Sequence, residues 1–245
     1  MAKLVYTNVR AFLSGTDFTG VSNKFGFETK YEDKDTTNYG SGGVHERIAG
    51  LVDTQVAGAG FWEAGTIANV DDELATNKTT IEPFTIAPTG TAFGAVTYLS
   101  QILWLDRKLF GSVGDVAPWE LSAGGSWPMV RGAVANSPGT PITVTGNGSG
   151  VQLGAVAAGQ RLYATLHVLS ISGTGGPTLT VKIQSGTTSG FPAPVDQLTF
   201  SAATTVSGQI LRTTGSAITD TWYRAAFTVA GSSPSFLATI GFGIA

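Results

Sequence analysis

The chain has 245 residues, no cysteine and a formal net charge of −3. Without cysteine it can form no disulfide, no thiolate metal site and no cysteine nucleophile. Charged residues make up only 13% of the sequence, against roughly 25% in typical soluble domains. This low charge indicates that other subunits cover part of the surface, although a surface solvated by Thr and Ser hydroxyl groups would also explain it.

Strand patterns dominate the first half of the chain. Residues 23–31 alternate apolar and polar side chains, the period of a half-buried strand. Residues 51–65 continue in the same way, and their glycines predict a bulge or a bend. The stretches 78–88 and 94–105 are rich in β-branched and aromatic residues, which also predicts strands.

One short segment indicates a helix. In residues 69–77, Asn69 is a suitable N-cap, and the acids that follow would lie near the positive end of the helix dipole. Such a helix would have two turns at most. Residues 100–110 could also be helical, but their β-branched and aromatic flanks favour a strand.

The second half predicts further short strands separated by turns. The predicted strands are 162–172, 178–185, 196–202, 221–231 and 235–245. Glycine and proline predict turns at Gly173–Pro177 and Gly231–Pro234. Many short strands with such turns are typical of a sandwich or barrel, so the predicted fold class is all-β with at most one short helix.

A change in composition predicts a domain boundary. Residues 132–150 are rich in Gly, Pro, Asn and Ser, although an exposed hairpin would have a similar composition. Residues 1–120 carry 15 of the 17 acids and 9 of the 14 Lys and Arg residues, a net charge of −6. We therefore predict a β domain over residues 1–135 and a C-terminal β-sandwich over residues 136–245.

Catalytic and metal-binding patterns are missing from the sequence. There are two histidines, and no nucleophile-elbow or metal-ligand spacing surrounds them. We interpret His45 as part of a loop, and His167 as a strand residue that shares a face with Leu169 or points to solvent. The acidic stretch before His45 fails as a calcium loop, because Asn38 replaces the required Gly and Val44 the required Glu. We predict no enzyme activity, no catalytic residue, no metal and no cofactor.

The sequence also bears on location and on nucleic acid. It contains no signal-peptide pattern and no apolar run of about 18 residues that could span a membrane. We therefore expect a soluble chain made in the cytoplasm, with no membrane partner. No basic patch with interleaved aromatic residues occurs, which argues against tight nucleic-acid binding.

The order of several short motifs resembles the major tail tube proteins of long-tailed phages, particularly those of actinobacteria. The matching motifs are LSGTD (13–17), TNYGS (37–41), HERIAGLVD (45–53), GFWEA (60–64) and SVGDVAPWELSAGGSWPMVRG (112–132). The C-terminal strands resemble a sandwich found at the end of many such proteins. The resemblance covers most of the chain, and its specificity lies in the order of the motifs.

The resemblance implies a structural role in a virion. Subunits of this family form rings, commonly hexameric, that stack into a hollow tube around a tape-measure protein and later around DNA in transit. The implied partners are further copies of this chain, the tape-measure protein and tail-terminating or tip proteins, with only transient, non-specific contact with DNA. The implied location is the phage tail, assembled in the host cytoplasm.

We place the ring-stacking loop at residues 32–47. Its candidate contact residues are Glu32, Asp33, Lys34, Asp35, Tyr39, His45 and Arg47. We hypothesise that the charges pair across rings and that Tyr39 acts as an apolar anchor. Alternation predicts that Phe61 and Trp62 lie on opposite faces of their strand, one in the core and the other available to a neighbouring subunit.

Two other functions remain open on the sequence. The C-terminal sandwich could bind carbohydrate or a host surface, with Trp222, Tyr223 and Phe236 as stacking platforms. The chain could also be a capsid decoration protein. Electron microscopy separates these alternatives, because only the tail tube hypothesis predicts hollow tubes or rings.

Overall fold

The computed structural model describes residues 6–63, 80–109 and 111–245. These residues form strands and turns, and no helix occurs among them, which confirms the all-β prediction. Nor does the described part contain any helix long and apolar enough to cross a bilayer. The helix predicted at residues 69–77 lies outside the described residues.

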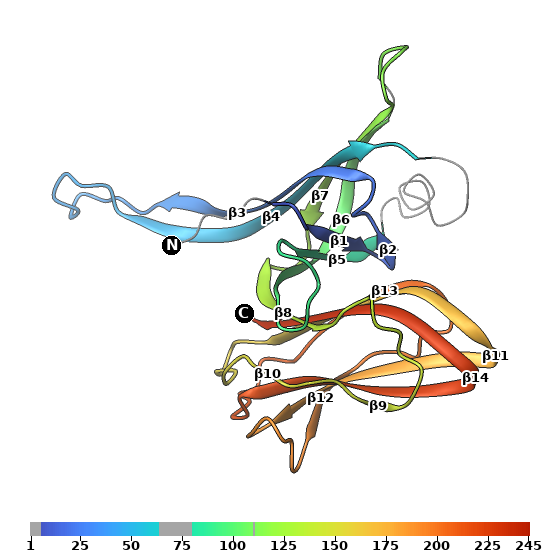
Figure 1. The fold of residues 1–245 in the computed structure, drawn as a ribbon. Coiled ribbons are helices and arrows are strands. Elements are labelled where there is room, and N and C mark those ends of the chain that lie inside the picture. Colours follow the sequence, from blue (N-terminus) through green and yellow to red (C-terminus); the bar gives the residue numbers. More distant parts are fainter. Residues whose placement is uncertain (1–5, 64–79, 110) are drawn as a thin grey trace.

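The N-terminal half forms one curled antiparallel sheet (Figure 1). Its strands are β1 (Arg10–Leu13), β2 (Thr16–Asp17), β3 (Ser22–Asp35), β4 (Arg47–Phe61), β5 (Ile81–Ala87), β6 (Val96–Leu109) and β7 (Pro118–Gly125). Across the sheet they lie in the order β3, β4, β7, β6, β5, β1 and β2. The curl encloses a cluster of buried apolar residues: Ala11, Leu13, Phe18, Val56, Phe84, Ile102, Trp119, Leu121 and Ala123. Residues 100–109, for which a helix was an alternative, lie in strand β6.

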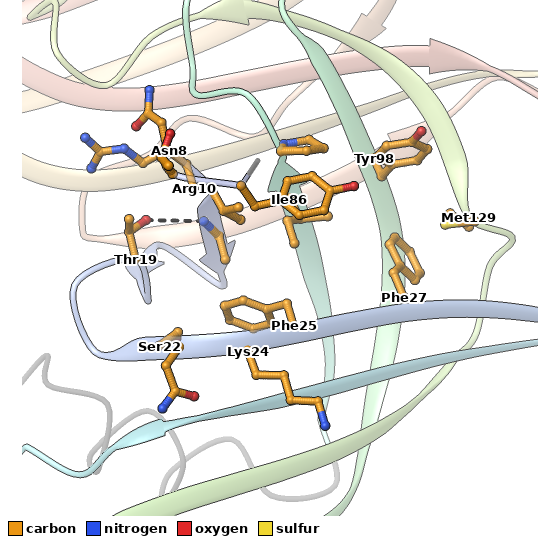
Figure 2. Close-up of a pocket in the computed structure, with 16 residues that line it drawn as sticks. Asn8, Arg10, Thr19, Ser22, Lys24, Phe25, Phe27, Ile86, Tyr98 and Met129 are labelled. Carbon is orange, nitrogen blue, oxygen red and sulfur yellow. Dashed lines mark hydrogen bonds between the residues drawn. The ribbon is translucent and has the colours of Figure 1, made fainter. Parts of the chain in front are cut away.

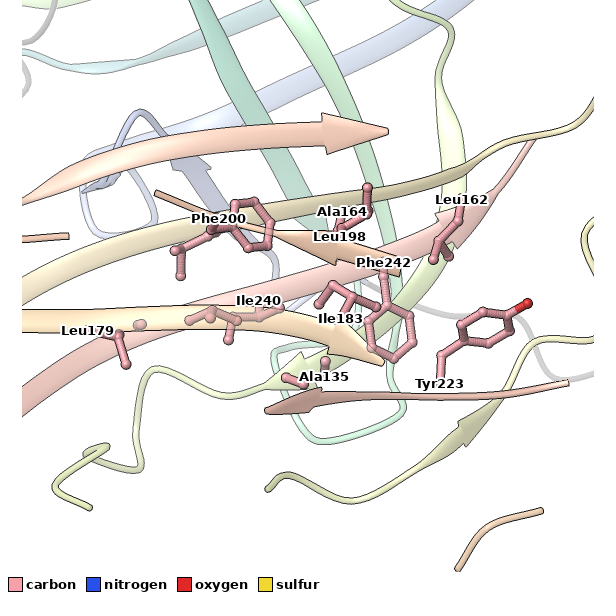
Figure 3. Packing of buried hydrophobic residues seen from close by; sticks show 14 of the residues in the cluster. Ala135, Leu162, Ala164, Leu179, Ile183, Leu198, Phe200, Tyr223, Ile240 and Phe242 are labelled. Carbon is pink, nitrogen blue, oxygen red and sulfur yellow. The ribbon is translucent and has the colours of Figure 1, made fainter. Parts of the chain in front are cut away.

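The C-terminal half is a sandwich of two sheets (Figure 1). Its strands are β8 (Val130–Asn136), β9 (Gly146–Asn147), β10 (Val151–Gln152), β11 (Leu162–Gly186), β12 (Val195–Thr199), β13 (Ser207–Arg212) and β14 (Trp222–Ile244). Large side chains from both sheets, among them Phe200, Ile183 and Phe242, fill the space between them (Figure 3).

The turns predicted at residues 173–177 and 231–234 are wrong, because β11 and β14 are each continuous. The two glycine-rich segments lie opposite one another, with Thr174 paired to Ser232 and Thr178 to Ala230 across register shifts. Both strands therefore bend together, and one long ribbon passes from the first sheet of the sandwich into the second (Figure 1). A glycine-rich segment can either reverse the chain or bend a paired strand. Composition alone does not distinguish the two, which is why turns were predicted here.

The first part of β11 is buried on both faces. Residues 162–168 are all buried, because one face lies in the sandwich core and the other packs on the N-terminal sheet. On the second face Thr85 Oγ1 of β5 donates to Thr165 Oγ1 at 2.8 Å. His167 Nε2 lies 2.8 Å from the same Thr85 oxygen, and since the Thr85 proton is engaged, Nε2–H is the donor. His167 therefore does not point to solvent, contrary to one of the two orientations predicted.

Strand β8 joins the two halves. It pairs with β6 on one side and with β14 on the other. The segment read as a boundary from residue 132 therefore begins inside a strand. The N-terminal apolar cluster ends at Ala123, and the sandwich cluster begins at Ala135. The division into domains 1–135 and 136–245 remains a prediction.

Candidate functional site: an exposed two-stranded arm

Strands β3 and β4 form an arm that leaves the body of the protein. They pair from Ser22 and Gly60 out to Asp35 and Arg47, whereas β7 borders β4 only over 55–61. Beyond that point, residues 29–54 form a two-stranded ribbon with no third strand beside it among the described residues. Figure 1 shows this arm projecting from the sheet, with its tip, residues 36–46, at the far end.

Near the body, one face of the ribbon packs against the apolar core. The same face carries apolar residues farther along the arm, where no core lies against it in the described part of the chain. Near the body, Phe25 and Phe27 point inward and contact Phe84. Two-residue alternation places Tyr31 and its cross-strand partner Val52 on the same face. They are 65% and 47% exposed, because no part of the described chain covers this section of the arm. An apolar strip therefore extends from the core to the surface.

Several large apolar side chains of the arm are exposed to solvent. Its exposed large apolar residues are Tyr31, Tyr39, Val44, Ile48, Leu51 and Val52. Each such side chain would contribute roughly 1.5–3 kcal/mol if a partner buried it fully. Contiguous exposed apolar patches on soluble proteins commonly mark interaction sites. The arm is therefore the best candidate for an assembly surface.

Several charged residues near the end of the arm have partners within the arm itself. Lys34 pairs with Glu32, and Arg47 pairs across the strands with Asp33. His45 Nδ1 lies 3.3 Å from Asp35 Oδ2. All these side chains are substantially exposed, so solvent screens each pair and the pairs contribute little to stability. The hypothesis that these charges pair across rings stays a prediction, and in the isolated chain they already have partners.

Local hydrogen bonds close the tip of the arm. The amide of Thr36 donates to the Glu46 carbonyl at 2.8 Å, and the Thr37 amide donates to the Asp35 carboxylate at 2.8 Å. Hydrogen bonds from Thr37 and then His45 hold the pKa of Asp35 below its usual range. His45 Nδ1 lies 3.3 Å from Thr37 Oγ1. Among the described residues, His45 therefore contacts only others at the end of the arm, as the interpretation of it as part of a loop predicts.

The loop predicted over residues 32–47 is shorter at both ends in the structure, and its role in ring stacking remains a prediction. Strand β3 continues to Asp35 and β4 begins at Arg47, so the loop spans only residues 36–46. Charged residues on both faces of a strand, as over 32–35, lack the alternation that identifies a half-buried strand. They can form a strand here because the ribbon is solvated on both sides.

At the other end of β4, Phe61 and Trp62 lie as alternation predicts. Phe61 is exposed, whereas Trp62 packs against the N-terminal apolar cluster. Phe61 pairs with Pro118 at the start of β7, beside the loop that carries the exposed Val113 and Val116. A contact between Phe61 and a neighbouring subunit remains a prediction.

A groove lies at the root of the arm. It has a volume of about 940 Å³ and is bordered by β3, by residues 6–11 and by parts of β5 and β6. Figure 2 shows Phe25 and Phe27 on one side of the hollow, with Ile86, Tyr98 and Met129 across from them. The sequence analysis missed this site, because it is formed by segments far apart in the chain.

Two of the three predicted carbohydrate platforms are not available. Tyr223 and Phe236 are fully buried between the two sheets of the sandwich, and Trp222 is only partly exposed. Burial raises the pKa of Tyr223 to about 12, and its hydroxyl donates to the Asp220 carbonyl at 3.0 Å. Tyr223 and Phe236 face inward because they lie on the sheet faces that form the core.

The described part of the chain was predicted to lack metal-binding groups, and its two histidines lie in different settings. The described residues contain no cluster of three or more His, Asp or Glu side chains that could hold a metal ion. Burial lowers the pKa of His167 to about 3, so this ring is neutral at physiological pH. Its hydrogen bond to Thr85 gives it a structural role between the two halves.

Comparisons with known proteins complete the description. No protein-family model and no curated protein sequence matches this chain. Among solved structures it is similar to a chain of the PVC sheath–tube complex, an extracellular contractile injection system (14% identity, TM-score 0.44, 54% of this chain and 93% of that chain). It is also similar to the SPP1 tail tube subunit (9% identity, TM-score 0.42, 53% and 78% covered). A third similar structure is the SPP1 Dit protein, of a hub adsorption apparatus (10% identity, TM-score 0.35, 97% and 99% covered).

Proposed function

We propose that this chain is a structural subunit of a phage tail tube and that it assembles with copies of itself through the β3–β4 arm. The observation that carries the proposal is the arm, a two-stranded ribbon whose apolar core face continues into solvent. The order of the N-terminal sequence motifs, which resembles tail tube proteins, supports the same role. No catalytic group is needed for it.

In this proposal the subunits close into rings, commonly hexameric in the family that the sequence resembles, and the rings stack into a conduit for DNA. Ring closure would pair strand edges without open-ended growth in the plane of the ring. A conduit should not bind phosphate strongly, and the net charge of −6 over residues 1–120 agrees with that need. The further partners would be the tape-measure protein and tail-terminating or tip proteins, in a virion assembled in the host cytoplasm.

The test is electron microscopy of the purified protein together with a variant that lacks residues 36–44. This deletion leaves His45 and Glu46 between the paired Asp35 and Arg47, which is the two-residue connection of a tight hairpin. We expect wild type to form hollow tubes or rings. The deletion variant should remain folded by circular dichroism and monomeric by light scattering.

A matched control distinguishes the arm from general loss of apolar surface. The variant Val144→Ser, Val195→Ser and Val206→Ser removes exposed apolar side chains from the C-terminal half and should still assemble. Intact tubes from the deletion variant would refute the role of the arm. Discrete trimers from wild type would instead favour a decoration protein, and monomers that bind glycan would favour a surface-binding module.

A further inference from the structure

We propose that the two halves of the chain open about strand β8 when His167 is protonated, so that mild acid separates them while each half stays folded. His167 lies in the contact between the halves, where one face of β11 packs on the N-terminal sheet and the ring is hydrogen-bonded to Thr85 of β5. The inference concerns the fold of the single chain and does not depend on the proposed role in a tube.

Strand β8 lies where the two halves meet, and other strands of the halves face one another in layers outward from it. β8 pairs with β6 and with β14, and Gly241 of β14 lies against side chains of β6. In the next layer Thr165 of β11 meets Thr85 of β5. Farther out, a Cβ added to Gly208 of β13 would lie 2.6 Å from Pro83 Cγ of β5. Rotation about β8 breaks the contacts of these layers in turn and leaves the pairing of β8 intact, since the halves lie one above the other (Figure 1).

The contact between the halves contains several buried polar side chains. Thr85, Thr97, Thr165 and His167 are each at most 3% exposed. Hydroxyl and imidazole groups regain hydrogen bonds with water when they are exposed, so their exposure costs less free energy than the exposure of apolar side chains. Each half has an apolar cluster of its own, which stays closed when the halves separate. We therefore expect the contact between the halves to open before either core does.

The closed contact accommodates only the neutral form of His167. Its ring is fully buried, Nε2–H donates to Thr85, and Nδ1 has no hydrogen-bond partner among the described residues. Protonation adds an unpaired N–H at Nδ1 and a full positive charge, beside the Phe12 ring, whose centroid lies 5.9 Å away. Opening exposes the ring to water, which solvates both the charge and the new N–H.

No acid of the described chain is placed to balance this charge. The charged and titratable residues of the strands that border His167 are Arg10 on β1, Asp17 on β2, Glu82 on β5, Tyr163 and Lys182 on β11, Arg212 on β13, and Tyr223 and Arg224 on β14. Of these, Asp17 is paired with Phe12 and lies on the side of the contact, but its exposed carboxylate accepts from the Thr19 amide at 2.9 Å. Glu82 lies three positions before Thr85 and therefore on the opposite face of β5. Burial is accordingly the cause of the lowered pKa of His167.

The pH dependence of opening follows from the two environments of the ring. In the closed form the pKa of His167 is about 3, and in the open form the hydrated ring regains its ordinary pKa of 6.5. Opening therefore takes up a proton below pH 6.5. The population of the open form should rise by about 25-fold between pH 7 and pH 5. Above pH 6.5 the ring is neutral in both forms, and this group gives opening no dependence on pH.

Thiol labelling detects such openings, and the chain has no cysteine of its own. Thr165→Cys places a thiol in the contact between the halves, whereas Ala123→Cys and Ala225→Cys place one in the core of each half, and all three positions are fully buried. The labelling rate of each full-length variant with a dithiodipyridine reagent is divided by the rate of a cysteine peptide at the same pH.

We expect Thr165→Cys to be labelled at least about tenfold faster than the two core variants, because local opening costs less than unfolding a half. Its labelling should also depend less on urea, because separation of the halves exposes less surface. Its relative rate should rise about 25-fold from pH 7 to pH 5. Equal rates and equal urea dependence at the three positions would show that the chain opens only by complete unfolding, and would overturn the inference.

Two substitutions of His167 show whether this residue is the trigger. His167→Gln keeps a side-chain N–H that can donate to Thr85, whereas His167→Leu removes it, and neither new side chain titrates. Combined with Thr165→Cys, each should abolish the rise in labelling between pH 7 and pH 5. The two variants are independent, so the test stands if only one of them folds. An unchanged rise in a folded variant would assign the effect to another group and overturn the inference.

Discussion

The buried histidine between the two halves predicts a specific dependence of stability on pH. His167 is fully buried, and its pKa falls from the ordinary value of 6.5 to about 3 because the charged form is desolvated. As the pH falls below 6.5, the unfolded chain takes up a proton at this position while the folded chain does not. The free energy of unfolding must therefore decrease between pH 6.5 and pH 3, with no further loss from this group below pH 3.

The size of the effect near pH 5 depends mainly on the unfolded chain. At pH 5 the unfolded histidine is almost fully protonated and the folded one is almost fully neutral. One pKa unit corresponds to about 1.4 kcal/mol, so this group lowers the free energy of unfolding by about 2 kcal/mol between pH 7 and pH 5. The result changes little if the folded pKa differs by a unit.

Urea denaturation of wild type and of His167→Leu, each at pH 7 and pH 5, measures this contribution. Leucine has no titrating group, and the hydrogen bond from Thr85 to Thr165 remains in the variant. The carboxylates titrate equally in wild type and variant. The difference between the two proteins in how the free energy of unfolding changes with pH therefore gives the contribution of His167. An identical loss of stability in the variant on going to pH 5 would refute a neutral, buried His167.

Two further predictions follow from the fold and from the arm. Tyr39→Ala should change the free energy of unfolding, measured by urea titration, by less than about 0.5 kcal/mol, because the side chain is exposed. Electron microscopy should nevertheless show no tubes from this variant, whereas the control Val195→Ala should still form them. Gly132→Ala should destabilise the protein by more than about 2 kcal/mol, because its new Cβ would lie 2.0 Å from the Phe242 carbonyl oxygen, whereas Gly139→Ala should be neutral in the same urea assay.

The all-β class and the position of most strands could be predicted from the sequence. Alternation along residues 23–31 and 51–65 predicted the two strands of the arm, because one face of each is buried near the body. The same rule placed Phe61 and Trp62 on opposite faces. Alternation stops where the arm becomes solvated on both faces, so the strand ends at Asp35 and Arg47 were missed.

Tertiary structure decided the features that depend on what lies opposite a segment. Composition could not distinguish a chain reversal at residues 173–177 from a bend shared with residues 231–234, because only pairing across the ribbon determines which forms. Likewise, Tyr223 lies in the core because of the sheet stacked against it, and not because of its own neighbours in sequence.

The arm, which we propose as the assembly surface, illustrates the same difference between local properties and tertiary contacts. The sequence by itself determined that the segment around Tyr39 is polar, glycine-rich and flanked by strands, since these are local properties. It did not determine that the charges around it pair within the arm, or that Phe25, Tyr98 and Met129 line one groove. Those contacts join residues far apart in the chain, and only the folding of the sheet brings them together.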